Sequence, residues 1–303
     1  MHLVITGGTG LIGRHLIEAL LRDGHTITLL TRSPACAEQL FQGKTRNVPW
    51  PEIHDNDPWP NHIAAADGVV HLAGAPINRR WSPEYKQEIR RSRVEPTRAL
   101  TSAMIEASDR PRVLVSGSAI GFYGPGDDWV DENSPKGNDF LADVVHAWES
   151  EAARAQDAGI RTVYLRTGLV LSEDGGALAR MVLPFRLFVG GPLGSGDQWL
   201  SWIHRDDLIG LIRTILERED IAGPVNGTAP HPVRMREFAR TLGRVMHRPA
   251  RFRVPGALLR LVLGEMADLV LTGQRVRPAA ALRMGYTYRF EHLEPALQDL
   301  LAK

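Results

Sequence analysis

The chain of 303 residues is 43% hydrophobic and 23% charged, a composition typical of a globular protein that buries its own core. Its 36 basic and 35 acidic side chains nearly cancel, which argues against a nucleic-acid partner or an anionic membrane surface. The single cysteine, Cys36, excludes an internal disulfide. No group of cysteines and histidines has the spacing of a zinc site, so we predict no metal.

The chain also lacks the patterns of a secreted or membrane-spanning protein. A strand-like apolar run starts at residue 3, with no basic segment, long apolar segment or cleavage site before it. The most apolar later stretch, residues 257–271, contains Arg260, Glu265 and Asp268, and it is too short and too charged to cross a bilayer. We therefore expect a cytoplasmic protein.

Short β-rich runs alternate with helical patterns through the first two thirds of the chain, which is typical of an α/β protein with a parallel sheet. We expect strands at residues 3–6, 26–31, 46–49, 69–72, 112–116 and 162–166. We expect helices at residues 12–23, 84–107 and 139–158. Asp139 suits the N-cap of the last helix, and Gly159 suits the position just past its end.

This rhythm ends after Arg166. Glycine-rich loops at 174–176 and 190–196 flank an apolar helical run at 177–189, and a further helix is expected after Asp206-Asp207. His204 and Asp207 suggest a catalytic dyad, but we expect Asp207 to cap that helix and His204 to bond to backbone. The C-terminal part reads as mixed helix and loop.

The first predicted strand leads into Gly7-Gly8-Thr9-Gly10-Leu11-Ile12-Gly13, and a helical pattern follows. Glycines at this spacing allow a tight turn, a close approach of backbone to a pyrophosphate, and close packing of helix on strand. Free N–H groups and the dipole at the helix N-terminus then attract phosphate oxygens. The strand before the glycines and the helix after them favour a dinucleotide site over a glycine-rich turn without a ligand.

We therefore expect a Rossmann-type, doubly wound parallel sheet with a smaller, mainly C-terminal α/β lobe. The predicted NADP-binding domain covers residues 1–230, with a flap-like insertion at about 171–200, and the smaller domain covers 231–303.

The second predicted strand ends at Thr31-Arg32-Ser33. An NAD-specific site usually has an acidic residue here, which accepts hydrogen bonds from the ribose hydroxyls. An arginine between two hydroxyl side chains suits a 2′-phosphate instead, so we predict NADP(H) as the cofactor. The alternative is that Arg32 is a solvated cation at the end of a strand.

These features, with His71-Leu72-Ala73-Gly74 and Ser116-Gly117-Ser118-Ala119 at two further strand ends, resemble extended short-chain dehydrogenases/reductases. The string Leu193-Gly194-Ser195-Gly196-Asp197-Gln198-Trp199, followed by Trp202-Ile203-His204, is similar to an atypical branch of that superfamily. The branch is labelled nucleoside-diphosphate-sugar epimerase-like, or cell-division inhibitor-like. Its C-terminal domain of unknown function resembles residues 251–301.

The resemblance implies a fold of about seven strands and bound NADP(H), and it implies no established substrate. Together with the glycine loop, it gives a set of predicted cofactor contacts. They are Gly7, Thr9, Gly10, Leu11, Ile12, Gly13, Thr31, Arg32, Ser33, Leu72, Ala73, Gly74, Ser116, Arg166 and Thr167.

The superfamily's catalytic pair, Tyr-x-x-x-Lys on a helix, is absent, because none of the five tyrosines has a lysine four residues later. When the third predicted helix is aligned on Glu149, Leu141 and Val145 occupy the two positions of the pair on an apolar face. Asp143 and His146 point largely away from that face. We therefore expect an apolar wall there and no replacement by either polar residue.

Two hydroxyl groups stay as catalytic candidates. Ser118 matches the superfamily's serine, and Tyr123 is the nearest phenol in the sequence. The alternatives are a serine that only hydrogen-bonds to cofactor or backbone, and a tyrosine packed in a tight turn.

Candidate substrate contacts are Arg80, which could reach phosphates, and Gln198, Trp199 and Trp202, because amide and aromatic groups suit a sugar or planar ligand. The alternatives are an exposed arginine and tryptophans packed in the core. By resemblance, the helices at 84–107 and 139–158 form a homodimer.

Two functions remain open from the sequence. One is an oxidoreductase or epimerase that uses NADP(H) on a small carbonyl or sugar-like substrate. The other is a non-catalytic NADP(H)-binding sensor or scaffold, which the missing Tyr-x-x-x-Lys pair favours.

Overall fold

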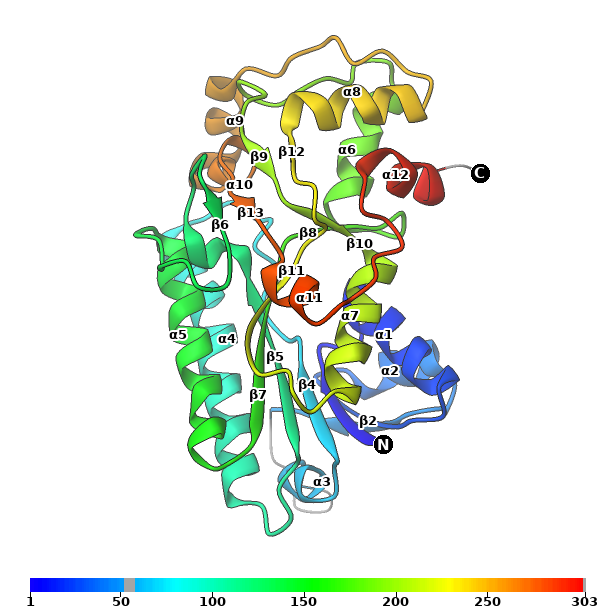
Figure 1. Ribbon diagram of the computed structural model, residues 1–303, viewed down its shortest axis with the longest axis vertical. Coiled ribbons are helices and arrows are strands. Elements are labelled where there is room, and N and C mark those ends of the chain that lie inside the picture. The colour runs from blue at the N-terminus through cyan, green and yellow to red at the C-terminus, as the bar shows by residue number, and fades with distance from the viewer. Residues whose placement is uncertain (52–57, 302–303) are drawn as a thin grey trace.

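The computed structural model describes residues 1–51 and 58–301, built around one large parallel sheet (Figure 1). Within these residues the sheet has seven strands in the order β11-β7-β5-β4-β1-β2-β3. They are β1 (His2–Thr6), β2 (Thr26–Thr31), β3 (Arg46–Pro49), β4 (Gly68–His71), β5 (Val113–Ala119), β7 (Arg161–Thr167) and β11 (Gly223–Gly227). The strand order reverses between β1 and β4, the place where open α/β sheets bind ligands. The predicted Rossmann-type fold is confirmed.

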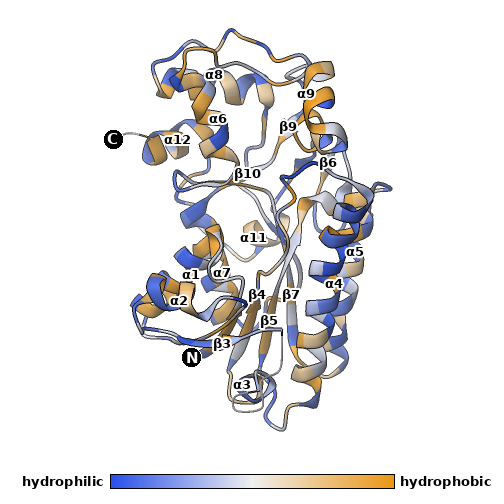
Figure 2. Ribbon diagram, turned by 180° about the vertical axis from the view of Figure 1, so that it is seen from behind, coloured by the Kyte–Doolittle hydropathy of each residue, from blue (hydrophilic) through white to orange (hydrophobic). Residues whose placement is uncertain are grey.

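Helices cover both faces of this sheet. One face carries α1 (Leu11–Arg22), α2 (Pro34–Phe41) and α7 (Arg205–Glu217), whose apolar side chains share a core with β1, β2 and β7. The other face carries α3 (Pro60–Ala64), α4 (Pro83–Glu106) and α5 (Phe140–Asp157). Figure 2 shows orange apolar residues along the strands and blue polar residues on the outer surfaces of α4 and α5.

The helix α5 begins and ends where its sequence predicts. The Asp139 carboxylate accepts a hydrogen bond from the backbone N–H of Ala142 at 2.8 Å, so it supplies the N-cap. Gly159 follows the helix with a φ of 80°, a conformation that favours glycine. The strands at 26–31 and 46–49 also have the predicted bounds.

A second lobe lies beyond the carboxyl ends of the strands, at the top of Figure 1. It contains α6 (Gly176–Arg186), α8 (Met235–Val245) and α12 (Leu293–Leu301), with β8 (Leu169–Leu171) paired to β10 (Trp202–His204) and β9 (Trp199–Leu200) paired to β12 (Val233–Arg234). Trp202 and Phe238 are among the largest side chains in its core.

Shorter elements join the two lobes. They are the 3-10 helix η1 (Ile120–Tyr123), β6 (Trp129–Val130) paired to β13 (Arg275–Val276), α9 (Gly256–Leu263), η2 (Gly264–Ala267), α10 (Asp268–Leu271) and α11 (Ala279–Arg283).

The core of the second lobe draws on two separate parts of the chain. Leu171, Leu178 and Leu200 come from the segment expected as a flap-like insertion, and they pack with Phe238 and Leu297 from the C-terminal part. The insertion is therefore a structural layer of the second lobe. The domain boundary at residue 230 remains a prediction.

Over the described residues, no helix combines the length and the apolar character needed to span a membrane.

Candidate functional site

The glycine loop between β1 and α1 is held in a shape that only glycine allows. Gly7 has a φ of 71°, and a Cβ there would lie 2.7 Å from the backbone carbon of Leu72. A Cβ on Gly13 would lie 2.3 Å from the Gly7 carbonyl oxygen and 2.6 Å from the Gly8 Cα. These distances are shorter than van der Waals contact. The backbone of the turn therefore packs directly on the backbone that follows β4 and on the start of α1.

The N-terminus of α1 has free donors. Gly10 is the N-cap residue, and no side chain accepts a hydrogen bond from the first turn. The first N–H groups of a helix have no partner inside the helix, so those of Leu11, Ile12 and Gly13 face outward as donors. The turn carries no acidic residue that would repel an anion. This is the chemistry of a phosphate-binding turn.

The end of β2 lies beside this turn, because β2 pairs with β1 in parallel. Thr31 is buried, and its hydroxyl accepts a hydrogen bond from the Ser33 N–H at 3.2 Å, which fixes the bend after the strand. Arg32 is exposed, and no carboxylate among residues 1–51 and 58–301 forms an ion pair with it. Its guanidinium is therefore available to a ligand.

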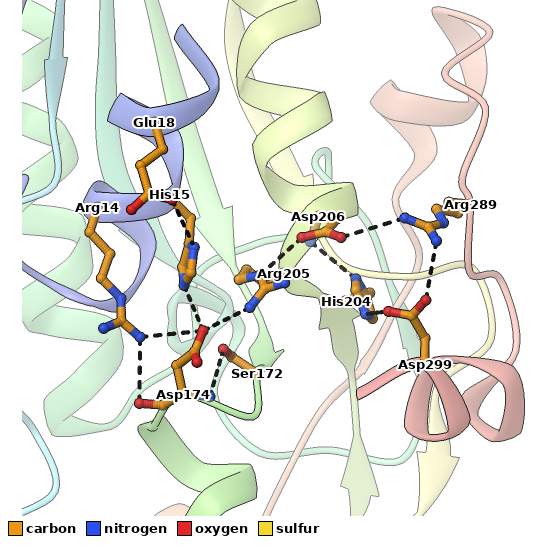
Figure 3. Close-up of polar contacts among 10 residues, drawn as sticks. All are labelled: Arg14, His15, Glu18, Ser172, Asp174, His204, Arg205, Asp206, Arg289 and Asp299. Atoms are coloured by element: carbon orange, nitrogen blue, oxygen red, sulfur yellow. Dashed lines mark hydrogen bonds and ion pairs between the residues drawn. The ribbon is translucent and has the colours of Figure 1, made fainter. Parts of the chain in front are cut away.

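Two arginines and a histidine hold the loop that follows β8 against α1, around the Asp174 carboxylate (Figure 3). Asp174 Oδ2 lies 2.9 Å from His15 Nε2, 3.4 Å from an Arg14 nitrogen and 2.8 Å from an Arg205 nitrogen. The next residues, Gly175 and Gly176, pack on the Leu11 side chain. The loop at 172–176 therefore closes over the first turn of α1.

The loop after β4 borders the same site and is fixed from behind. His71 is fully buried, with Thr6 Oγ1 at 2.6 Å from Nδ1 and Thr97 Oγ1 at 2.9 Å from Nε2. Burial, with a smaller contribution from Arg93, lowers its pKa to about 4, so the imidazole is neutral. The Thr6 hydroxyl also accepts from the Ala73 N–H at 3.3 Å.

Two further predicted contacts, Leu72 and Gly74, lie in that loop, and the Arg93 side chain packs against Gly74. Ser116, at the end of the pairing between β5 and β4, is buried, and its hydroxyl donates to the Gly117 carbonyl at 3.2 Å. Thr167 ends β7 with its hydroxyl on the Leu165 carbonyl. The structure therefore places these residues at or just after the carboxyl ends of the strands, and their contact with a cofactor stays a prediction.

Ser118 and Arg166 belong to one buried ionic network. Both Glu149 carboxylate oxygens accept from Arg166, each at 2.8 Å, and the Ser118 hydroxyl donates to the same carboxylate at 2.5 Å. All three side chains are almost fully buried. Their polar groups bond to each other across β5, α5 and β7, so the Arg166 side chain forms an internal ion pair, and its contact with a cofactor stays a prediction.

Tyr123 extends this network toward β11. Its hydroxyl donates to Asn226 Oδ1 at 2.7 Å and accepts from Arg166 Nη1 at 3.1 Å, and the side chain is only 7% exposed. Burial raises the pKa of Tyr123 to about 12, with the nearby Arg166 acting in the opposite direction. The phenol therefore stays protonated and bonded. The sequence left two alternatives for Tyr123, a catalytic phenol and a tyrosine packed in a tight turn. The packed tyrosine agrees better with this geometry.

The positions of the missing pair are filled by hydrocarbon. Leu141 packs on Gly121 of η1, and Val145 is buried against Phe122 and Tyr123. Asp143 is exposed and pairs with Lys136 at 2.7 Å on the outer side of α5. The predicted apolar wall is present.

The predicted substrate contacts divide into two groups. Arg80 is exposed and lies against Gly264, at the junction of the two lobes, and Trp199 is half-buried with the Arg234 and Arg275 guanidinium groups over its ring. Trp202 is fully buried, and its indole donates to the His231 carbonyl, which agrees with the alternative of a tryptophan packed in the core.

Gln198 is also buried and bonded to its neighbours, so its contact with a substrate stays a prediction. Its amide donates to the carbonyls of Leu193 at 3.0 Å and Val270 at 2.6 Å, and it is 8% exposed. The side chain joins a loop to α10 because the neighbouring backbone carbonyls use its donors. The sequence string that contains it is therefore structural at this position.

Asp207 was expected to cap α7, and that prediction is wrong. His204 caps α7, since its Nδ1 accepts from the Asp206 N–H at 3.1 Å, whereas Asp207 is buried and accepts from the Arg289 and Phe290 N–H groups. Arg289 also pairs with Asp299, 3.4 Å from His204 Nε2 (Figure 3). These residues hold the C-terminal segment onto α7.

Sequence reasoning missed Glu149 and Asn226 as members of the network. Glu149 served only as an alignment marker, and Asn226 lies in a strand that the sequence did not predict. A buried glutamate on an otherwise apolar face, opposite an arginine in a buried strand, was the available signal for the ion pair.

The family follows from comparison with known proteins. The model of the NAD dependent epimerase/dehydratase family matches residues 3–226, and a domain of unknown function (DUF1731) matches residues 254–300. This chain belongs to the NAD dependent epimerase/dehydratase family. Its resemblance to extended short-chain dehydrogenases/reductases is thereby confirmed.

Two relatives match over nearly the full length. The chain is 44% identical to the chloroplastic epimerase family protein SDR39U1 homolog of Arabidopsis thaliana, over 99% of this chain and 87% of that protein. It is 38% identical to epimerase family protein YfhF of Bacillus subtilis, over 100% and 98%.

Solved structures agree. Human epimerase family protein SDR39U1 (isoform 2), crystallised with NADPH, is 35% identical, with a TM-score of 0.89 and full coverage of both chains. The UDP-glucose 4-epimerase of Thermotoga maritima, solved with UDP-glucose, is 15% identical with a TM-score of 0.81, over 100% of this chain and 98% of that one, and shows only a shared fold.

Proposed function

We propose that this chain binds NADP(H) on the β1–α1 loop and transfers hydride between the cofactor and a small carbonyl compound. The observation that supports it most is the glycine turn, in which added Cβ atoms would fill the space next to free helix N–H groups. The likeness to a human relative solved with NADPH points the same way.

The described residues fit this cofactor. Leu11, Ile12 and Gly13 would hold the pyrophosphate through their backbone N–H groups. Arg32 would bind the 2′-phosphate, with Thr31 and Ser33 shaping the bend around it. When bound, NADP(H) supplies the hydride, and the protein supplies its orientation.

Proton transfer in this proposal does not use a Tyr-x-x-x-Lys pair. In this proposal the Ser118 and Tyr123 hydroxyls, the two catalytic candidates from the sequence, are positioning residues, because each donates its proton to a buried neighbour. They keep the ends of β5, β7 and β11 rigid below the site. The proton for the carbonyl oxygen then comes from solvent water, which is left as hydroxide.

The experiment that tests the proposed function is turnover of NADPH. Purified protein is mixed with NADPH and a panel of small aldehydes, ketones and nucleotide sugars, and absorbance of the reduced nicotinamide is followed. We expect oxidation with at least one compound. Binding of NADPH with no oxidation across the panel would contradict hydride transfer.

A second function, a non-catalytic NADP(H)-binding sensor or scaffold, is favoured by the closed network around Ser118 and Tyr123. Turnover of NADPH by the natural chain would exclude this second function. Ser118→Ala and Tyr123→Phe then test the positioning role, with Asp143→Asn as an exposed control, and turnover should fall in both variants while NADPH binding persists. A partner captured with NADPH and not with NADP⁺ supports the second function.

The homodimer remains part of our proposal. Its interface would use the outer surfaces of α4 and α5. Within one chain these two helices pack on each other, and the Arg98–Glu151 ion pair at 2.5 Å joins them. Light scattering of the intact protein measures the mass directly. A small carbonyl or sugar-like substrate remains a prediction, and so does a cytoplasmic location.

A further inference from the structure

Three ligand-type side chains meet in the second lobe, away from the glycine loop. His231 lies in the connection between β11 and β12, and Glu291 and His292 lie just before α12. One ligand atom of each lies within 4.8 Å of the other two. All three residues are exposed, so solutes in water can reach them.

The two imidazoles already face each other. The rings of His231 and His292 are parallel within 2°, with centroids 4.4 Å apart. A bound ion lies in the plane of each imidazole that binds it, at about 2.0–2.1 Å from the nitrogen. The stacked rings must therefore turn out of their parallel arrangement to share one ion, and both side chains are exposed, which leaves room for that turn.

The backbone that carries these ligands is anchored. The Trp202 indole donates to the His231 carbonyl at 3.0 Å, and the Phe290 N–H donates to the buried Asp207 carboxylate at 3.0 Å. On the other side, the first turn of α12 bonds to the His292 carbonyl. The fold therefore sets the backbone positions of the three residues, and the side chains turn toward the ion when it binds.

The surroundings suit a cation. His231 and His292 border a surface pocket of about 340 Å³ that Glu237, Arg244 and Glu294 also line. The Arg244 guanidinium pairs with Glu294 at 2.8 Å, which offsets its positive charge. Glu291 forms no ion pair with a described residue, so its carboxylate is available.

We propose that His231, Glu291 and His292 form a binding site for a divalent ion of the zinc class. Two imidazoles and one carboxylate are the donors that Zn²⁺ or Co²⁺ prefers over Mg²⁺, which binds oxygen ligands. Three protein ligands leave a fourth position for water. The ion links the β11–β12 connection to the segment before α12. This site is independent of the proposed function.

The test uses untagged full-length protein, because a histidine tag binds the same ions. Calorimetry with ZnCl₂ and the visible absorption of added CoCl₂ measure binding, with MgCl₂ as the comparison. The variants are His231→Asn and His292→Gln, and the control is His146→Asn, an exposed histidine on α5. Thermal unfolding without metal shows that each variant folds.

We expect one Zn²⁺ per chain, at least 10-fold weaker binding in His231→Asn and in His292→Gln, and no change in His146→Asn. Zn²⁺ should raise the unfolding temperature of the natural chain and of the control, and should leave both site variants unchanged. Absence of Zn²⁺ binding to the natural chain would overturn the proposal. Equal binding by the site variants would overturn it as well.

Discussion

At the scale of single residues, the polar groups behind the site are bonded to one another. Arg166 and Glu149 form a buried two-point ion pair, and Ser118 and Tyr123 attach to it. Removing one partner of such a pair leaves a buried charge without compensation. The network is therefore expected to contribute to stability more than to proton transfer.

Glu149→Gln tests that expectation. The substitution leaves the Arg166 charge buried without its carboxylate, so the free energy of unfolding should fall by about 3–5 kcal/mol. Urea denaturation followed by circular dichroism measures the change. Asp143→Asn, on the exposed side of the same helix, should change it by less than about 1 kcal/mol. A loss in Glu149→Gln no larger than in the control would show that the network is unimportant.

His71 predicts a dependence of stability on acid. Its pKa is lowered to about 4 by burial, whereas the unfolded chain binds a proton near 6.5. Stability from the neutral imidazole is thus complete above pH 6.5 and is lost as the pH falls toward 4, by up to about 3 kcal/mol. Unfolding free energies between pH 7 and 4 should show this slope in the natural chain. If His71→Asn kept the full slope, another group would be responsible.

At the scale of elements, the sequence predicted the parts with strong local signals. The strands β2 and β3, the cap at Asp139 and the glycine turn are set by neighbouring residues, and each was placed correctly. The strand β11, Gly223-Pro-Val-Asn-Gly, has almost no β-branched residues, and only its pairing with β7 makes it a strand. Two-residue strands such as β9 likewise depend on distant partners.

The loop at 172–176 gives a prediction at the same scale. Because Asp174 holds this loop over α1 through Arg14, His15 and Arg205, Asp174→Asn should weaken the closure. We expect NADPH to dissociate several-fold faster, as measured by stopped-flow displacement with excess NADP⁺. Asp220→Asn, which removes a remote surface ion pair with Arg218, serves as the control. An unchanged dissociation rate in Asp174→Asn would show that the loop does not close over the cofactor.

At the scale of the whole molecule, the chain crosses between two cores. Residues 171–202 enter the second lobe, and α7 and β11 return to the sheet (Figure 1). The helix α8 then packs in the second lobe, α11 packs on the core of the sheet, and α12 ends in the second lobe. Local patterns could not show this exchange, because it depends on contacts between residues far apart in sequence. The same reason explains why spacing rules did not bring His231 and His292 together, although the two rings stack in the structure.

The site was predictable to different depths. The glycine turn and Arg32 follow from a strand, a turn and a helix in sequence, so their placement was correct. The hydrogen bonds of the Gln198 and Trp202 side chains depend on which backbone carbonyls surround them, and a sequence pattern does not contain that information. The missing Tyr-x-x-x-Lys pair was readable from sequence, and the structure adds that hydrocarbon fills its place.

The most direct test of the account is a comparison of NADPH and NADH binding to the natural chain and to Arg32→Ala. Fluorescence titration should show NADPH bound at least 10-fold more tightly than NADH. In Arg32→Ala, NADPH should bind about 10–100-fold more weakly, since a hydrogen bond to a charged group contributes about 1.5–3 kcal/mol, while NADH binding stays the same. Arg22→Ala, at the far end of α1, should bind both as the natural chain does. Equal affinity for the two cofactors, or no loss in Arg32→Ala, would contradict the account.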